Sequence, residues 1–275
     1  MRKSELNETL PYLYEASVQG VDNDLDFAGR IYRRRHGRRP KRIREDFCGS
    51  ALLASTWVRR RPANRAWGVD LHRPTLDWSR RHHVERLSRP EADRLELIEG
   101  DVRTARIPPV QVTFALNFSF CIFYTRDELR EYFAAAREGL EDGGVLILDL
   151  YGGTEAVKEK EEPRAVDGFT TPEGVRVPPF TYVWDQDFYD VITHRCRNYI
   201  HFRIPGVGTI RRAHHYDWRL WTIPEVRELL AEAGFRSSEA YLHGWTDDGE
   251  SDEVWRRRTS YENAEAWIAY LAGWR

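Results

Sequence analysis

A short polar turn follows the first apolar run of the chain, and its residue types suit two kinds of chemistry. The stretch reads EDFCGSALLA and runs from Glu45 to Ala54. A cysteine beside glycine, serine and carboxylates has the composition of a reactive thiol site. The same residues also suit the tight turn after a first strand, where a ligand lies against the backbone. Which of the two applies decides the function.

The charges around Cys48 argue against a reactive thiol. A reactive cysteine needs a lowered pKa, from a cation or a helix N-terminus, and usually a histidine partner. Glu45 and Asp46 oppose a thiolate at Cys48, and no histidine is near in the sequence. We therefore predict that Cys48 is a packed thiol that lines the turn.

Further acidic residues stand at the ends of the next two apolar runs. Asp70 comes about 21 residues after Gly49, the spacing at which a second-strand carboxylate accepts hydrogen bonds from ribose hydroxyls. Asp101 follows Gly100 at the end of the third run and is placed to meet an adenine amino group. Because ligands of open parallel sheets bind at the carboxyl ends of strands, these acids indicate a nucleoside site.

Alternating short apolar runs and helical patterns must position these residues. This alternation is typical of βαβ units and a largely parallel sheet. The predicted strands span residues 43–47, 66–70, 95–99, 112–117 and 145–150. The predicted helices between them span residues 51–61, 73–87 and 126–140, and the last begins at an N-cap, Thr125, and stops at EDGG. Another helix, 24–36, precedes the first strand.

The pattern changes after Tyr151. Residues 155–179 are charged and contain Pro and Gly, which predicts an exposed excursion. Aromatic and β-branched residues then predict antiparallel strands within 180–204 and 209–221. A helix capped by Thr222 and two last strands, within 236–245 and 264–274, complete the chain.

Composition excludes several classes of protein. The 275 residues carry 42 Lys and Arg against 44 Asp and Glu, a net charge of −2, which argues against a bulk nucleic-acid or membrane binder. The three cysteines lack CxxC spacing, so we expect no disulfide framework and no metal site. Without a leader-like segment or an apolar run near about 18 residues, we expect a cytoplasmic protein.

Five motifs in order carry a resemblance to a known family. They read EDFCGSA, WGVDLHRPTLDWS, LIEGDVRT, TFALNFSF and GGVLILDL. The series resembles class I S-adenosylmethionine-dependent methyltransferases over residues 40–150, and WTIPEVRELLAEAGF resembles the helix before the last two strands of that fold. The resemblance implies a Rossmann-like, mostly parallel seven-stranded sheet with an antiparallel last strand and helices on both faces. An antiparallel β insertion and an N-terminal helical cap would be added to it.

We expect one domain over residues 1–275. Its parts are an N-terminal cap (1–40), a cofactor-binding core (41–154), a β insertion that forms a substrate lid (155–221) and the C-terminal part of the core (222–275).

The resemblance places S-adenosylmethionine across the first three strand ends. The cofactor-binding residues it implies, together with two from a candidate N-terminal flap, are Tyr14, Gln19, Glu45, Phe47, Cys48, Gly49, Ser50, Asp70, Leu71, Asp101, Val102 and Asn117. The first motif departs from the family pattern, because Phe47 and Ala51 stand where glycines are usual. A Cβ makes φ > 0 costly, so we expect Phe47 to change how the methionine end sits. Arg44 and Asp46, charged residues in a buried strand, need a ligand or a salt-bridge partner.

The methyl acceptor would lie at the fourth strand end and on the β insertion. By the resemblance, residues 117–119 face the transferred methyl, although the prolines of the base-modifying methyltransferases are missing. The predicted substrate-binding residues are Asn117, Phe118, Ser119, Trp184, Tyr216 and Trp218. The aromatic residues also suit the core of a β layer. Candidate bases lie within 214–217. Our catalytic candidates are His215, from this group, and Tyr14.

We therefore predict methyl transfer from S-adenosylmethionine to nitrogen or oxygen of a small molecule, with S-adenosylhomocysteine as product. The turn lacks GxGxxG, which disfavours a dehydrogenase. Two alternatives stay open. Arg30–Arg42 places eight Arg or Lys in 13 residues, as in an RNA methyltransferase, although a solvated helix end and linker fit it as well. A cofactor-binding protein without turnover is the other alternative. We predict no nucleic-acid and no membrane partner, and the sequence sets no oligomeric state.

Overall fold

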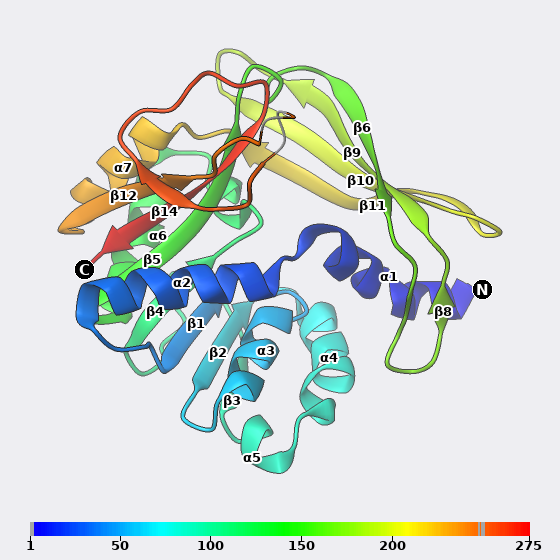
Figure 1. Cartoon of the computed structure of the whole chain (residues 1–275), viewed down its shortest axis with the longest axis horizontal. Coiled ribbons are helices and arrows are strands. Elements are labelled where there is room, and N and C mark those ends of the chain that lie inside the picture. The colour runs from blue at the N-terminus through cyan, green and yellow to red at the C-terminus, as the bar shows by residue number, and fades with distance from the viewer. Residues whose placement is uncertain (1–2, 247, 249–250) are drawn as a thin grey trace. The chain divides into compact units, whose positions relative to one another are not determined.

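The computed structural model describes residues 3–246, 248 and 251–275. The chain divides into two compact units (Figure 1). The core unit consists of Gly20–Thr154 and Trp221–Arg275, and the insertion unit consists of Met1–Gln19 and Glu155–Leu220.

The core unit is built on one mostly parallel sheet. Its strand order is β13-β12-β14-β5-β4-β1-β2-β3, with β1 parallel to β2 and β4, and β14 antiparallel to β5 and β12. The strands are β1 (Arg42–Asp46), β2 (Arg65–Asp70), β3 (Leu95–Glu99), β4 (Val110–Ala115), β5 (Leu140–Gly152), β12 (Ser237–Leu242), β13 (Arg256–Arg258) and β14 (Trp267–Trp274). We call the edge at which β1 to β5 end the carboxyl edge, and the opposite edge the amino edge.

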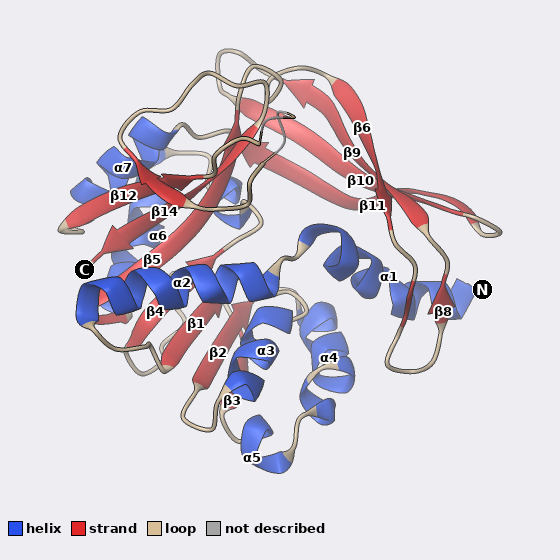
Figure 2. Cartoon of the chain, viewed as in Figure 1, coloured by secondary structure: helices blue, strands red, loops and turns tan. Residues whose placement is uncertain are grey.

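Helices pack on both faces of this sheet, as the ribbon shows (Figure 2). Val145 and Ile147 of β5 lie in one apolar cluster with Leu25 and Leu53 from two helices, whereas Leu146, on the other face of the pleat, is also fully buried. The helices are α2 (Val21–His36), α3 (Leu52–Arg60), α4 (Arg73–His82), α5 (Arg89–Ala92), α6 (Arg126–Glu138) and α7 (Ile223–Glu232), with short 3-10 turns at Val84–Arg86 and Ser119–Ile122.

The predicted Rossmann-like fold is confirmed, with one strand added. The eighth strand, β13, is three arginines that pair antiparallel with β12 at the sheet edge. Three arginines show no alternation of apolar and polar residues, so no sequence pattern predicts this strand. At an edge their charged side chains reach solvent and keep the strand from pairing further.

The two strongest helix starts are confirmed. Thr125 accepts from the N–H of Glu128 at the start of α6, and Thr222 accepts from that of Glu225 at the start of α7, each in a capping box. The helix α6 ends at Glu138, before the predicted stop at EDGG, because residues 140–144 already belong to β5.

The insertion unit contains a four-stranded antiparallel sheet in the order β11-β10-β9-β6. The predicted strands of 180–221 are confirmed as β9 (Phe180–Tyr189), β10 (Arg195–Ile204) and β11 (Gly208–Arg219). The exposed excursion predicted for 155–179 is wrong in part, because it contains β6 (Lys160–Val166), β7 (Phe169–Thr170) and β8 (Arg176–Val177). As an edge strand, β6 carries charged residues on both faces, which hid it from the sequence analysis.

The first helix, α1 (Lys3–Val18), belongs to the insertion unit. Its Leu13 is fully buried in a cluster with Phe180, Ile200 and Phe202 of the sheet. Over the part of the chain that the structure describes, no helix combines the length and apolar character needed to cross a membrane.

Candidate active site

The turn after β1 has the backbone of a glycine-rich loop, although only one of its three positive-φ residues is a glycine. Phe47, Gly49 and Ala51 adopt φ of 56°, 50° and 55°. Phe47 and Ala51 thus adopt the positive φ that a Cβ makes costly, by about 1–2 kcal/mol for each non-glycine residue. Cys48 N donates to Val69 O over 3.0 Å, and Ala51 N donates to Cys48 O over 2.7 Å, which fixes the turn against β2.

This turn has open space at Gly49 and an unsatisfied hydroxyl at Ser50. A Cβ built on Gly49 would meet no atom within 4 Å. The Ser50 hydroxyl is buried and has no hydrogen-bond partner among the described residues. A buried hydroxyl without a partner is costly, which points to a polar group that this chain does not itself supply.

Glu45 lies directly before the turn and is held in a buried position. Its Oε2 accepts from Ala54 N over 2.9 Å, at the start of α3. Burial raises the pKa of Glu45 to about 8, and the charges of Asp24 and Asp70 add to the shift. The site therefore holds more acidic groups than it can keep ionised at neutral pH, and a bound cation would relieve the repulsion.

The acid at the end of β2 shapes the same turn. Asp70 Oδ2 accepts from Gly49 N over 2.8 Å, and Oδ1 accepts from His72 N over 2.8 Å. The next residue, Leu71, is 66% exposed. Asp70 thus keeps two backbone N–H groups in place and retains lone pairs for further donors.

The acid at the end of β3 is paired within its own loop. Arg103 binds Asp101 through its guanidinium at 2.6 Å and through its backbone N–H at 2.8 Å. These bonds hold the pKa of the Asp101 carboxyl below its usual range, so it stays ionised. The neighbouring Val102 is buried.

The turn after β4 is fixed by an acid that the sequence analysis did not select. Asn117 and Phe118 adopt φ of 57° and 58°, and their N–H groups each donate to the Asp149 carboxylate over 2.9 Å. Ser119 Oγ donates to Leu116 O over 2.7 Å. Asp149 therefore presents the predicted substrate residues 117–119.

Two more acids complete a cluster at the carboxyl edge. Loss of hydration raises the pKa of Asp149 to about 7 and that of Asp24 to about 6, and the charge of Asp24 adds to the shift of Asp149. The Tyr270 hydroxyl donates to Asp24. The available signal was positional, since Asp149 stands near the end of the apolar run GGVLILDL as Asp70 stands at the end of its own. Asp24 and Tyr270 carried no such signal, because they stand in the first turn of a helix and in a strand that reaches the edge from the opposite direction.

A buried ion pair lies at the end of β1, immediately before the turn. Arg44 Nε donates to Asp46 Oδ1 over 2.5 Å, and its Nη2 donates to Val102 O over 2.6 Å. Asp46 Oδ2 accepts from the Tyr132 hydroxyl over 3.0 Å. The sequence left open whether Arg44 and Asp46 bind a ligand or a salt-bridge partner, and in the structure they form a salt bridge with each other. It ties β1, the loop after β3 and α6 together.

The structure agrees with an inert Cys48. The thiol is 1% exposed, and burial together with the charge of Glu45 raises its pKa well above the usual value. A Cβ added to Gly68 would stand 2.9 Å from Cys48 Sγ, so the thiol fills the space that this glycine leaves.

One face of the insertion unit gathers most of the aromatic residues predicted to bind substrate. Tyr216 lies 4.3 Å from Trp218 and 5.8 Å from Trp184 between ring centroids, and Tyr14 lies 4.7 Å from His214. Burial lowers the pKa of His214 to about 4, so this imidazole is neutral at pH 7. The face is apolar, with phenol hydroxyls and a neutral imidazole.

The other candidate base lies on the opposite face of the same strand. His215 stacks on Tyr199, with centroids 5.1 Å apart, because adjacent residues of a strand point to opposite sides. The structure thus separates His215 from Tyr14. Gln19 ends the same N-terminal segment, one residue beyond α1, and its N–H donates to Glu15 O over 3.1 Å.

A cluster of possible metal ligands, Glu161, Asp185 and His201, also lies on the insertion unit. The Arg212 N–H donates to His201 Nδ1 over 2.7 Å, and Nε2 lies 2.9 Å from Asp185 Oδ2. With Nδ1 occupied as an acceptor, Nε2 must carry the proton, which it donates to Asp185. A metal would need that nitrogen bare, so the geometry fits a hydrogen-bonded network.

Comparisons with known proteins bear on the fold. No family model matches the sequence, and no curated protein matches it. Among solved structures, S-adenosylmethionine-bound CalS10, an amino pentose methyltransferase from Micromonospora echinaspora, is 16% identical, with a TM-score of 0.64 over 94% of this chain and 95% of that chain. The fold is that of the class I methyltransferases.

Two further structures have the same fold. A S-adenosylmethionine-dependent methyltransferase from Clostridium acetobutylicum is 16% identical, with a TM-score of 0.65 over 97% of this chain and 98% of that chain. The sugar N-methyltransferase KedS8 from Streptoalloteichus is 16% identical, with a TM-score of 0.62 over 94% of this chain and 91% of that chain. At this identity the likeness establishes the fold, and the chemistry has to be argued from the residues of this chain.

Removing one member of the buried ion pair should cost more than removing both. Arg44→Met leaves Asp46 buried without its partner, and we expect it to lower the free energy of unfolding by about 3 kcal/mol. In Arg44→Met/Asp46→Asn the asparagine oxygen still accepts from Tyr132, so the double variant should be more stable than Arg44→Met alone. Urea denaturation measures both. Equal or greater destabilisation of the double variant would contradict the coupling.

Glu45 should make the protein less stable as the pH rises. Its pKa is raised to about 8 in the folded protein from 4.5, so the folded state binds the extra proton between these values. Stability from this group is complete below about pH 4.5 and is lost as the pH passes 8, with a slope of at most about 1.4 kcal/mol per pH unit. Glu45→Gln keeps an acceptor for Ala54 N and should flatten this slope. Urea denaturation of both proteins from pH 5 to 9 tests it, and parallel profiles would refute the assignment.

Proposed function

We propose that the protein is a S-adenosylmethionine-dependent methyltransferase that methylates nitrogen of a small molecule. The observation that carries the proposal is the turn after β1, where Phe47, Gly49 and Ala51 keep a glycine-loop backbone at the cost of strain. Strained backbone persists at functional sites where the surrounding structure imposes it. The comparison structures, among them two N- or amino-sugar methyltransferases, support this choice.

The charges at the carboxyl edge fit this cofactor. S-adenosylmethionine carries positive charge on its sulfonium and its ammonium group. Burial raises the pKa of Glu45 and of Asp149, and the charges of nearby carboxylates add to both shifts. The unpartnered Ser50 hydroxyl and the open space at Gly49 lie on the same turn. A phosphate-bearing cofactor would meet acidic repulsion here.

We assign roles to these residues as follows. Glu45 and the turn 47–50 hold the methionine end, Asp70 accepts from the ribose hydroxyls, and Asp101 with Val102 meets the adenine. Bound S-adenosylmethionine supplies an electrophilic methyl group on positively charged sulfur. The chain's part in catalysis is then to hold the acceptor in line with that methyl and to exclude water. Residues 117–119, fixed by Asp149, carry the acceptor side of the core unit.

An amine acceptor must lose a proton before or after it attacks. The acids with pKa of about 7 and 8, Asp149 and Glu45, are groups that accept protons near neutral pH. The apolar face formed by Trp184, Tyr216 and Trp218 suits a ring-shaped organic acceptor such as a sugar, whose C–H face packs on aromatic rings.

Cofactor binding can be measured without knowing the acceptor. Isothermal titration of the folded protein should detect S-adenosylmethionine and S-adenosylhomocysteine. Asp70→Asn removes one charged acceptor and should weaken binding at least about tenfold. The matched control is Asp77→Asn, on the exposed side of α4, which should bind as the native protein does. Folded native protein that binds neither compound would refute the proposal.

Turnover is tested separately, by release of S-adenosylhomocysteine with a panel of amino sugars and other small amines. We expect at least one acceptor to give release above the acceptor-free rate. Binding without release over the whole panel would favour a cofactor-binding protein that does not catalyse transfer.

A further inference from the structure

A pocket of about 530 Å³ lies on the core unit at the amino edge, formed by α2, the segment before β1 and the end of α3. We call it the arginine pocket. The arginines that line it are Arg30, Arg33, Arg34, Arg39, Arg60 and Arg61. Asp26 is the one acid among the lining residues. In a chain with a net charge of −2, this is a strong local excess of positive charge.

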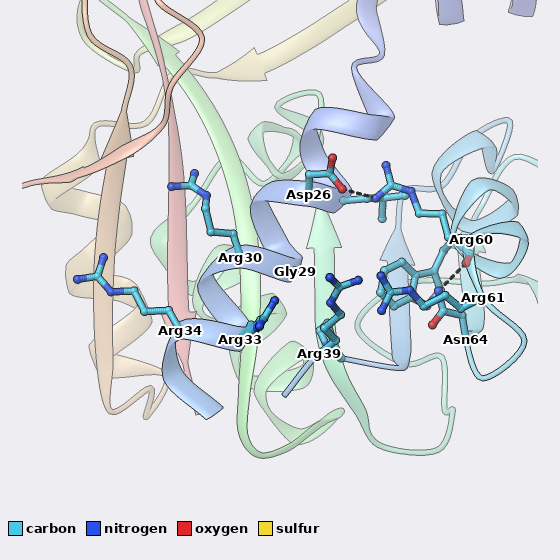
Figure 3. A pocket seen from close by; sticks show the side chains of 12 residues that line it. Asp26, Gly29, Arg30, Arg33, Arg34, Arg39, Arg60, Arg61 and Asn64 are labelled. Atoms are coloured by element: carbon cyan, nitrogen blue, oxygen red, sulfur yellow. Dashed lines mark hydrogen bonds and ion pairs between the residues drawn. The ribbon is translucent and has the colours of Figure 1, made fainter. Parts of the chain in front are cut away.

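The fold brings these arginines together from three separate segments. Gly37, with φ of 67°, ends α2 and turns the chain back, so that Arg39 returns beside Arg33 (Figure 3). Gln111 Oε1 accepts from the N–H groups of Lys41 and Arg42, over 2.6 and 3.1 Å, which anchors the returning segment. Figure 3 also shows that Arg30 and Arg34 point away from Arg61. Arg33, Arg39 and Arg61 are therefore the central group.

The charges of this central group are not neutralised within the protein. Arg60 pairs with Asp22 and Asp26, each over 2.5 Å, and outside the pocket Arg257 pairs with Glu239. Among the residues that the structure describes, no carboxylate pairs with Arg33, Arg39 or Arg61. Three uncompensated guanidinium groups around one concavity repel one another, and an anion would remove that repulsion.

The wall of the pocket has a second feature that points to a ligand. Gly29 stands in the interior of α2, where glycine destabilises a helix relative to alanine. A Cβ built there would meet no atom within 4 Å, so packing does not require the glycine. Its absence of a side chain keeps that part of the wall open. The floor is closed by Trp57, which donates through Nε1 to Lys41 O over 3.1 Å.

We infer that the arginine pocket is a second binding site, for the polyphosphate group of a small molecule. Guanidinium groups bind phosphate oxygens in bidentate fashion, and several of them match the charge of a di- or triphosphate. The volume suits a small ligand. The pocket faces the amino edge, whereas the proposed cofactor site lies at the carboxyl edge, so the two ligands would bind separately. A nucleic acid would need a longer track of unpaired cations, and Arg256 and Arg257 nearby are already paired.

Titration calorimetry of the full-length protein at low salt tests the inference with pyrophosphate, ATP and single-stranded RNA oligonucleotides of increasing length. We expect pyrophosphate and ATP to bind, and added salt to weaken them. Tighter binding of ATP than of pyrophosphate would identify a nucleotide site, and equal binding a site for the phosphates alone. Arg39→Gln/Arg61→Gln should weaken binding about 100-fold, at about tenfold for each charged partner.

Two further variants separate the site from general charge effects. Arg59→Gln/Arg89→Gln removes two exposed arginines outside the pocket and should leave pyrophosphate binding unchanged. Gly29→Met fills the pocket without changing charge and should weaken binding about tenfold or more, with no loss of thermal stability. Binding of S-adenosylmethionine is measured on the same variants and should be unchanged in all of them. Failure of the arginine-pocket inference can therefore be distinguished from failure of the proposed function.

Three results would overturn the inference. The first is no binding of pyrophosphate or ATP to the native protein at low salt. The second is an equal loss of affinity in the pocket variant and in the matched control. The third is RNA affinity that exceeds that of ATP and rises with length, which would make the surface a nucleic-acid contact.

Discussion

The ion pair between Arg44 and Asp46 is the constraint on which the carboxyl edge depends. Both side chains lie in the middle of the sheet, where each charge alone would cost several kcal/mol of hydration. The cost is met because each remaining polar atom has a partner: Val102 O and Ala105 O take the other N–H groups of Arg44, and Tyr132 binds Asp46. The same bonds hold the turn after β1 against the loop after β3. Two loops of the proposed cofactor site thus share one support.

The strained turn above this support explains how the site departs from a glycine-rich loop. Left-handed backbone is cheap for glycine and costly for phenylalanine. Here the Phe47 ring packs at 5.6 Å from Tyr132 and 6.2 Å from Phe123, so contacts made by the large side chain offset the strain. The backbone conformation is retained while the residue type differs. This is why a pattern of glycines detects the turn poorly and the tertiary fold matches solved methyltransferases at 16% identity.

The net charge of −2 hides a strong segregation of charge within the core unit. Carboxylates of Asp24, Glu45, Asp70 and Asp149 gather at the carboxyl edge, and unpaired arginines gather at the amino edge. Such a distribution attracts a cationic ligand to one edge and an anionic ligand to the other. It also separates like charges, which would repel one another more strongly in a single patch.

The sequence by itself determined the elements whose signals are local. The periodic apolar runs predicted the core strands, and Thr125 and Thr222 predicted two helix starts, because capping involves neighbouring residues. It also selected Glu45, Asp70 and Asp101, which stand at or near the ends of their strands. Only the tertiary structure decided which distant groups meet. It joined Asp149 to the turn 117–118 and Asp24 to Tyr270, it placed Arg39 and Arg61 in the wall of one pocket, and it put His214 and His215 on opposite faces. These contacts depend on strand order and register, which residues far apart in the chain set jointly through packing.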